Sequence, residues 1–256
     1  MKLEDSFLDL KLNENLRAFR EKHRSEYLVL FKLKAFLDEI QNCFIDKTVS
    51  KQDMFLSASI IELNKLFQSA VLLFERGLPE SANIVVRSVL ELSFRIIELI
   101  RNDDFLQEMI FDINSEALNT LNYIKKKGMY DIIDQNYLEQ LLNSCNELNS
   151  KNNRSDIRVS QLAKRNGMEK EYILYRTYCD YTHQSAKVID EIVEIKPNGV
   201  NLNGGLRLDD FSESIAMLAS ITMISFQDIV RHPLIHEKME SQFDLLQNEF
   251  VKAFQQ

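Results

Sequence analysis

One short stretch of the sequence concentrates side chains that could carry acid–base or phosphate chemistry. Tyr172 to Ser185 contain four tyrosines together with Arg176, Asp180 and His183. Arg176 and His183 are separated by almost two turns of an α-helix, which predicts one shared helix face and Cα atoms roughly 10–11 Å apart. Histidine changes charge near neutral pH, and arginine binds phosphate through its planar guanidinium. The stretch therefore predicts His183 as a general acid or base and Arg176 as a phosphate clamp.

The role of His183 has two interpretations. In the chemical one, Asp180 or Glu91 fixes the tautomer of the imidazole, and Tyr175 and Tyr181 complete the candidate site. In the structural one, the histidine only forms a hydrogen bond with a tyrosine or a glutamate in a polar seam of the core. The spacing of the residues leaves both interpretations open.

A second group of charged residues lies on one stripe of the otherwise apolar segment 79–101. Its members, at intervals of three or four positions, are Arg87, Glu91, Arg95 and Glu98. Such a stripe is either an ion-pair ladder in water or one wall of a polar cleft, where buried charges must be paired. In a cleft, Arg87 and Glu91 would join Tyr175 as the side chains that support the candidate site.

Composition restricts the class of protein. The chain has 256 residues, of which 45% are hydrophobic, and a formal net charge of −8. It can bury one large core but has no general positive field, so no DNA partner is expected. The three cysteines follow neither a zinc pattern nor a disulfide framework, which predicts a reducing compartment. No uninterrupted apolar run approaches the roughly 18 residues of a membrane span, which predicts a soluble cytoplasmic protein.

Six glycines and three prolines leave few positions that break helices, so the sequence predicts an all-α fold. Apolar spacing predicts helices over 8–44 with a break near 22–25, 54–74, 79–101, 104–127, 135–150, 160–165, 169–194, 209–231 and 233–254. Residues 199–208 predict a short β-hairpin or ordered loop that turns at Asn203-Gly204-Gly205. We expect a single domain over 1–256, with its core at about 50–195 and with N-terminal helices (1–48) and C-terminal helices (209–254) packed on it.

Other chemical motifs are weak or missing. The sequence has no Gly-rich phosphate loop, dinucleotide fingerprint or Gly-x-Ser-x-Gly motif, which disfavours NTP hydrolysis, dehydrogenation and α/β-hydrolase chemistry, and no cofactor is expected. His232 and His236 lack further ligands, so no metal site is expected. The basic residues within 125–127 and 151–165 are either solvated faces or RNA contacts.

Two sequence blocks carry a resemblance to a known family. They are Arg76-Gly77-Leu78 leading into Arg87-x3-Glu91, and Tyr175-Arg176-x2-Cys179-x3-His183-x-Ser185-Ala186. Over roughly 55–193 the chain resembles a bacterial all-helical family of unknown function that looks HEPN-like. The resemblance implies a helical bundle that dimerises. Many HEPN proteins are metal-independent endoribonucleases of toxin–antitoxin and anti-phage systems that use a closely spaced arginine and histidine on one helix, and Arg176-x6-His183 matches the upper end of that spacing.

The sequence thus favours a HEPN-like ribonuclease, or an effector derived from one, in bacterial antiviral defence. RNA is then a candidate partner, the protein is a homodimer, and an antitoxin or another defence-system component is a candidate partner protein. The alternative hypothesis is a non-catalytic interaction module in which Arg87, Glu91 and His183 form a structural or ligand-binding seam. Stability separates the two hypotheses, because removing one member of a buried network costs several kcal/mol. A small-molecule enzyme that uses the tyrosine-rich stretch is a third hypothesis.

Overall fold

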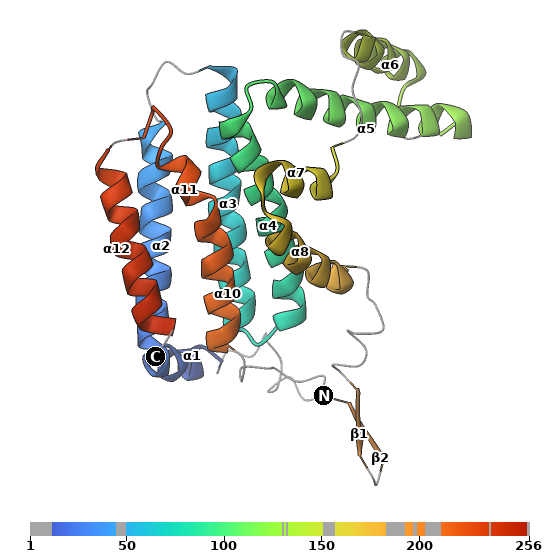
Figure 1. The fold of residues 1–256 in the computed structure, drawn as a ribbon. Helices are drawn as coiled ribbons and strands as arrows, with labels where there is room; N and C mark the ends of the chain where they lie inside the picture. Colours follow the sequence, from blue (N-terminus) through green and yellow to red (C-terminus); the bar gives the residue numbers. More distant parts are fainter. Residues whose placement is uncertain are drawn as a thin grey trace.

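The described part of the chain is almost entirely helical, which confirms the predicted all-α class (Figure 1). The computed structural model describes residues 12–44, 50–129, 131, 133–150, 157–182, 193–196, 199–202, 211–235 and 237–254. The helices of the first part are α1 (Leu12–Lys22), α2 (Arg24–Cys43), α3 (Lys51–Glu75) and α4 (Pro79–Arg101). The predicted break near 22–25 is confirmed, since only His23 separates α1 from α2.

The boundaries of α3 and α4 follow from local chemistry. Ser50 begins α3 with a capping box, in which its side chain accepts a hydrogen bond from the backbone of Asp53 and the Asp53 carboxylate accepts one in return. Gly77 between the helices has a φ of 67°, which a residue with a Cβ adopts only with strain. Pro79 then starts α4 in its first turn, where its missing N–H costs nothing. The sequence prediction of 79–101 for this helix is confirmed.

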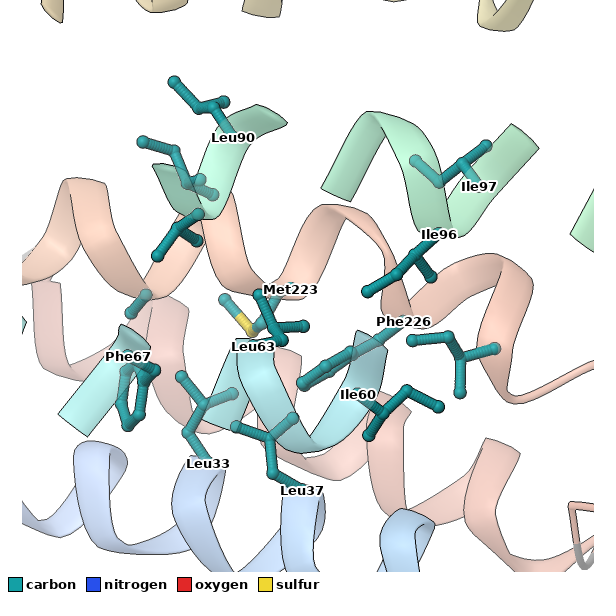
Figure 2. Packing of buried hydrophobic residues seen from close by; sticks show 14 of the residues in the cluster. Leu33, Leu37, Ile60, Leu63, Phe67, Leu90, Ile96, Ile97, Met223 and Phe226 are labelled. Atoms are coloured by element: carbon teal, nitrogen blue, oxygen red, sulfur yellow. The ribbon is translucent and has the colours of Figure 1, made fainter. Parts of the chain in front are cut away.

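The hydrophobic core forms where α2, α3, α4 and α10 (Phe211–Ile224) pack together. Figure 2 shows side chains from these helices interleaving around α3, with α2 on one side and α4 on the other. Leu33 and Leu37 come from α2, Ile60 and Leu63 from α3, and Leu90 from α4, and all of them are buried. Burying each such side chain stabilises the fold by about 1.5–3 kcal/mol.

Helix α3 is the described helix whose length and composition would allow it to cross a membrane. The core helix of a soluble protein meets the same criterion, and α3 packs against α2, α4 and α10. Leu56, Ile60, Leu63, Phe67 and Ala70 are all buried along it. Its place in the structure is at the centre of the helical bundle.

Helices α5 (Phe105–Lys127) and α6 (Gln135–Ser150) pack on each other and project from the bundle (Figure 1). Both agree with the predicted ranges. Only the first part of α5 is buried, through Phe105, Leu106 and Met109. The rest of this arm shares little of the main core.

The chain then returns to the bundle through α7 (Val159–Asn166) and α8 (Glu169–Thr182), both of which contact α4. The predicted helix 169–194 is wrong at its end, because Val193–Lys196 form strand β1, which pairs antiparallel with β2 (Gly199–Leu202). In Val193-Glu-Ile-Lys, β-branched and charged residues alternate, a pattern that suits a strand better than a helix end. The predicted hairpin at 199–208 is not confirmed, since β2 pairs with the segment before it and 203–210 lie outside the described residues.

The last part of the chain contains α10, α11 (Phe226–Ile229) and α12 (Lys238–Phe254). The predicted helix 209–231 is interrupted at Ser225, whose buried hydroxyl donates to the Thr222 carbonyl at 3.2 Å. A side-chain bond of this kind competes with the helical backbone ladder. The predicted helix 233–254 begins only at Lys238, and it packs along α2.

Candidate functional site

Helix α8 presents different residues to α4 and to solvent. Tyr175 is buried and Cys179, one turn later, is half-buried against α4, whereas Arg176 and Asp180 are exposed. Neighbouring positions on a helix point about 100° apart, so packing Tyr175 inward turns Arg176 outward. His183 lies outside the described residues. Of the predicted pair of Arg176 and His183, the structure therefore describes only Arg176.

Arg87 on α4 is the centre of the seam between α4 and α8, which we define by Arg87, Glu91, Tyr175 and Cys179. Its Nη2 donates to the Tyr175 hydroxyl at 2.6 Å, and its Nε donates to the Cys179 Sγ at 3.3 Å. The guanidinium carbon lies 4.9 Å from the centre of the Tyr175 ring, which adds a cation–π contact. Three interactions with one helix therefore hold this arginine in place.

Glu91 completes the seam from the same helix as Arg87. Its Oε2 accepts a hydrogen bond from the Tyr175 hydroxyl at 3.4 Å and lies 3.5 Å from Arg87 Nη2, and its Oε1 lies 3.3 Å from Arg95 Nη2. The three charged side chains are 23–26% exposed. The stripe predicted from the sequence thus forms an ion-pair ladder along α4, as the first interpretation expected. It also bonds to α8, as expected for the wall of a polar cleft, so each interpretation describes part of the stripe.

Glu98, the fourth member of the stripe, belongs to a different group of contacts. It is buried, and its Oε1 accepts hydrogen bonds from Asn102 at 3.0 Å and from Arg165 of α7 at 3.4 Å. Arg165 also bonds to Glu108 at 2.8 Å. These contacts join α4, α5 and α7.

Tyr175 and Arg87 keep their charge states at neutral pH. Burial and the negative charge of Glu91 raise the pKa of Tyr175 to about 12, so its hydroxyl stays protonated. Burial disfavours the charge on Arg87, but the hydrogen bond to Cys179 and the neighbouring Tyr175 and Glu91 outweigh it and raise the arginine's pKa. The seam offers a held cation and a neutral phenol, and neither group transfers protons near neutral pH.

A cavity of about 380 Å³ opens beside the seam, between α4, α8 and α10. Its walls include Asn83, Tyr178, Tyr181 and Glu213. Burial, with the negative charge of Glu213, raises the pKa of Tyr178. Tyr181, which the sequence assigned to the candidate site, therefore lines this cavity and does not belong to the seam.

A polar cluster at the junction of α2 and α10 was missed by the sequence analysis. The Ser212 hydroxyl donates to Glu26 Oε1 at 2.7 Å, and both groups lie 3.1 Å from the Nδ1 atom of His23. A catalytic serine triad places the serine and the carboxylate on opposite nitrogens of the imidazole, so this arrangement is an anchor between helices. Ser212 is too far from His23 and Glu26 in sequence to be associated with them from spacing.

A second missed feature is an arginine-rich pocket formed by α1, the start of α2 and the end of α3. The buried Glu75 carboxylate accepts bonds from Arg20, one of them at 3.0 Å, and from the Tyr27 hydroxyl at 2.7 Å. Arg17 and Arg24 line the same pocket. Arg17 and Arg20 are three positions apart and share a face of α1, but Arg24 begins α2, so spacing could have indicated only part of the pocket.

The described residues contain no group of three or more His, Cys, Asp or Glu side chains that could hold a metal ion. His232, weighed above as a weak metal candidate, lies 3.2 Å from Asp53 and joins α3 to the segment before α12. His236 lies outside the described residues.

Comparison with known proteins identifies a family. The model of a family of unknown function, DUF5677, matches residues 53–200, more than half of the chain. The matched part includes α3, α4 and α8 and therefore every residue of the seam. Neither the curated proteins nor the solved structures gave a match. The chain belongs to the family of unknown function DUF5677.

Proposed function

We propose that the protein is a HEPN-like, metal-independent endoribonuclease, or an effector derived from one, that works as a cytoplasmic homodimer in a bacterial toxin–antitoxin or anti-phage system. One observation carries the proposal. Arg176 is an exposed cation on a helix that Tyr175 and Cys179 hold firmly against α4. A phosphate in solution can reach this arginine, whereas Arg87 is occupied by protein groups.

The reaction needs only an acid–base group and a cation. His183 takes the proton of a ribose 2′-hydroxyl, the 2′-oxygen bonds to phosphorus, and the bond to the 5′-oxygen breaks. A protonated histidine returns a proton to that leaving oxygen, and Arg176 stabilises the charge on the phosphate oxygens. A homodimer that joins two copies of α8 supplies two histidines and two arginines to one cleft, which offsets the acidic net charge of the chain.

The test is incubation of total cellular RNA with the purified protein in EDTA, followed by a denaturing gel. We expect wild-type protein to cleave RNA, His183→Ala to abolish cleavage and Arg176→Ala to weaken it. Arg231→Ala is the matched control, because Arg231 is an exposed arginine outside α8 and outside the basic segments 125–127 and 151–165. A folded His183→Ala variant with full activity would overturn the proposal.

A second candidate function is a non-catalytic interaction module that binds a partner protein or a ligand. The observation in its favour is that Arg87, Glu91, Tyr175 and Cys179 bond to one another across two helices. Side chains in a mainly structural seam contribute to stability more than to activity. Absence of cleavage by wild-type protein, together with a large fall in melting temperature for both Glu91→Ala and His183→Ala, would favour this function.

A further inference from the structure

The arginine-rich pocket between α1, α2 and α3 has the size of a small-molecule site. Its volume is about 700 Å³, and it lies where the start of α2 meets Arg76, the residue that ends α3. Ligand sites in proteins commonly measure about 300–1,000 Å³. A ligand of some tens of atoms therefore fits into it.

The pocket is positively charged in an acidic protein. Its charged lining residues are Arg17, Arg20, Arg24, Arg76 and Glu21, and the buried Glu75 behind them offsets one arginine, which leaves a formal charge of two positive. The whole chain has a formal net charge of −8. Concave surfaces lined by one sign of charge concentrate ions of the opposite sign, so the pocket favours an anion.

The arginines of the pocket have different freedom to bind that anion. Arg20 is held by the buried Glu75 and forms part of the wall. Arg24 pairs at 3.1 Å with Glu21, but their side chains are 80% and 73% exposed, so water screens this pair and an anion can replace the carboxylate. Arg17 is also exposed. Arginine binds phosphate through two parallel N–H donors, which makes Arg17 and Arg24 suitable phosphate ligands.

Aromatic surface adjoins these arginines. The Phe31 side chain is 64% exposed, and its ring centre lies 6.3 Å from that of Tyr27. The Tyr27 ring is fixed, because its hydroxyl bonds to Glu75 and the Arg20 guanidinium lies over it at 5.7 Å. A second hollow of about 430 Å³ shares Arg20, Tyr27 and Phe31 and continues over Val71 and Leu72 of α3. Tyr27 is buried and its ring also stacks on Phe211 at 5.7 Å, so Phe31 presents the exposed aromatic face. Exposed aromatic faces stack with nucleobases.

We propose that this pocket binds nucleoside phosphates, with the phosphates on Arg17 and Arg24 and the base against Phe31. The arginines match the phosphates of such a ligand, and the exposed aromatic face beside them matches its base. A simple inorganic anion would contact the arginines alone. The same chemistry is present in a free nucleotide and in one unit of an RNA chain. The proposal does not depend on cleavage at Arg176 and His183, because the pocket is built from other helices.

The test is isothermal titration calorimetry of the full chain in EDTA and low salt, with ATP, adenosine, sodium tripolyphosphate and a ten-nucleotide oligoadenylate as ligands. We expect ATP to bind more tightly than adenosine and tripolyphosphate. The double variant Arg17→Gln/Arg24→Gln should weaken ATP binding by roughly tenfold or more. Phe31→Ala should weaken ATP binding but leave tripolyphosphate binding unchanged.

The matched control is Arg231→Gln/Lys252→Gln, which removes two exposed cations outside the pocket. Circular dichroism melting confirms the fold of each variant, and Arg20 and Glu75 remain in place. Oligoadenylate binding that exceeds ATP binding supports the proposal with RNA as the source of the ligand, and the reverse order supports it with a free nucleotide. No binding by wild-type protein, equal loss in the control, or adenosine or tripolyphosphate binding as tight as ATP would overturn it.

Discussion

The seam between α4 and α8 and the pocket between α1, α2 and α3 both contain arginine, tyrosine and glutamate side chains, but they distribute the charges differently. In the seam, Arg87 donates hydrogen bonds to Tyr175 and Cys179 and lies beside Glu91. Its guanidinium is therefore already paired with groups of the protein. In the pocket, the buried Glu75 holds one arginine and leaves others at the surface. Residue type alone therefore does not identify a binding site. The number of protein groups that an arginine already contacts decides whether it can bind a ligand.

The largest effect on stability is expected from the carboxylate that builds the pocket. Glu75→Gln keeps the shape of the side chain but removes the charge that accepts bonds from Arg20 and Tyr27. Arg20 is 51% exposed, so the loss is smaller than for a fully buried pair, and we expect roughly 2–3 kcal/mol. Urea unfolding measures it. Glu21→Gln, an exposed carboxylate in the same pocket, should change stability by less than about 0.5 kcal/mol, and equal losses would contradict the distinction.

The anchor beside the pocket should make stability depend on acid pH. Burial alone would raise the pKa of Glu26, but hydrogen bonds from Ser212 and Ser25 outweigh it and lower the pKa from 4.5 to about 2. The stabilisation by ionised Glu26 is therefore complete above its unfolded pKa and is lost as the pH falls toward 2.

Ser212→Ala tests this pH dependence. It should cost roughly 1–2 kcal/mol near pH 5, and the difference from wild type should shrink as the pH falls to about 2.5. Urea unfolding at each pH measures the difference. Ser88→Ala serves as the control, since the Ser88 hydroxyl bonds to a carbonyl of its own helix. A Ser212→Ala difference that stays constant across this range would contradict the assignment.

A smaller effect is expected in the seam. Tyr175→Phe removes the hydroxyl that joins Arg87 to Glu91 and keeps the ring, so the free energy of unfolding should fall by about 1 kcal/mol. A double-mutant cycle with Arg87→Met should give a coupling energy of similar size between the two residues. Coupling near zero would show that the seam contributes little to holding α8.

The smallest effect on stability is expected on the outer face of α8. Arg176→Ala removes an exposed side chain and should change the free energy of unfolding by no more than about 0.5 kcal/mol. Under the proposed function the same variant loses much of its RNA cleavage. A stability loss as large as that of Arg87→Met would place Arg176 among the structural arginines and would remove the basis for a phosphate clamp.

Most of the helix boundaries were predictable where the chain carries strong local signals. Gly77 and Pro79 fix the turn between α3 and α4, and Gly128 ends α5 in the left-handed conformation that favours glycine. The predicted helix 169–194 was wrong at Val193 and Glu194, because the apolar spacing continues there while Val193–Lys196 pair as a strand. The alternation in Val193-Glu-Ile-Lys suits a strand but covers only four residues, and pairing with the later segment Gly199–Leu202 decides that structure.

The sequence by itself determined the all-α class and the placing of Arg87 and Glu91 on one helix face, because helical periodicity fixes which residues of one segment share a face. Tertiary structure decided which face of α8 meets α4, and so made Tyr175 a partner of Arg87 and left Arg176 outside. It also made the arginine-rich pocket, since burial of Glu75 joins residues from three helices. Such contacts depend on how whole helices pack, and the spacing of residues within one helix cannot specify them.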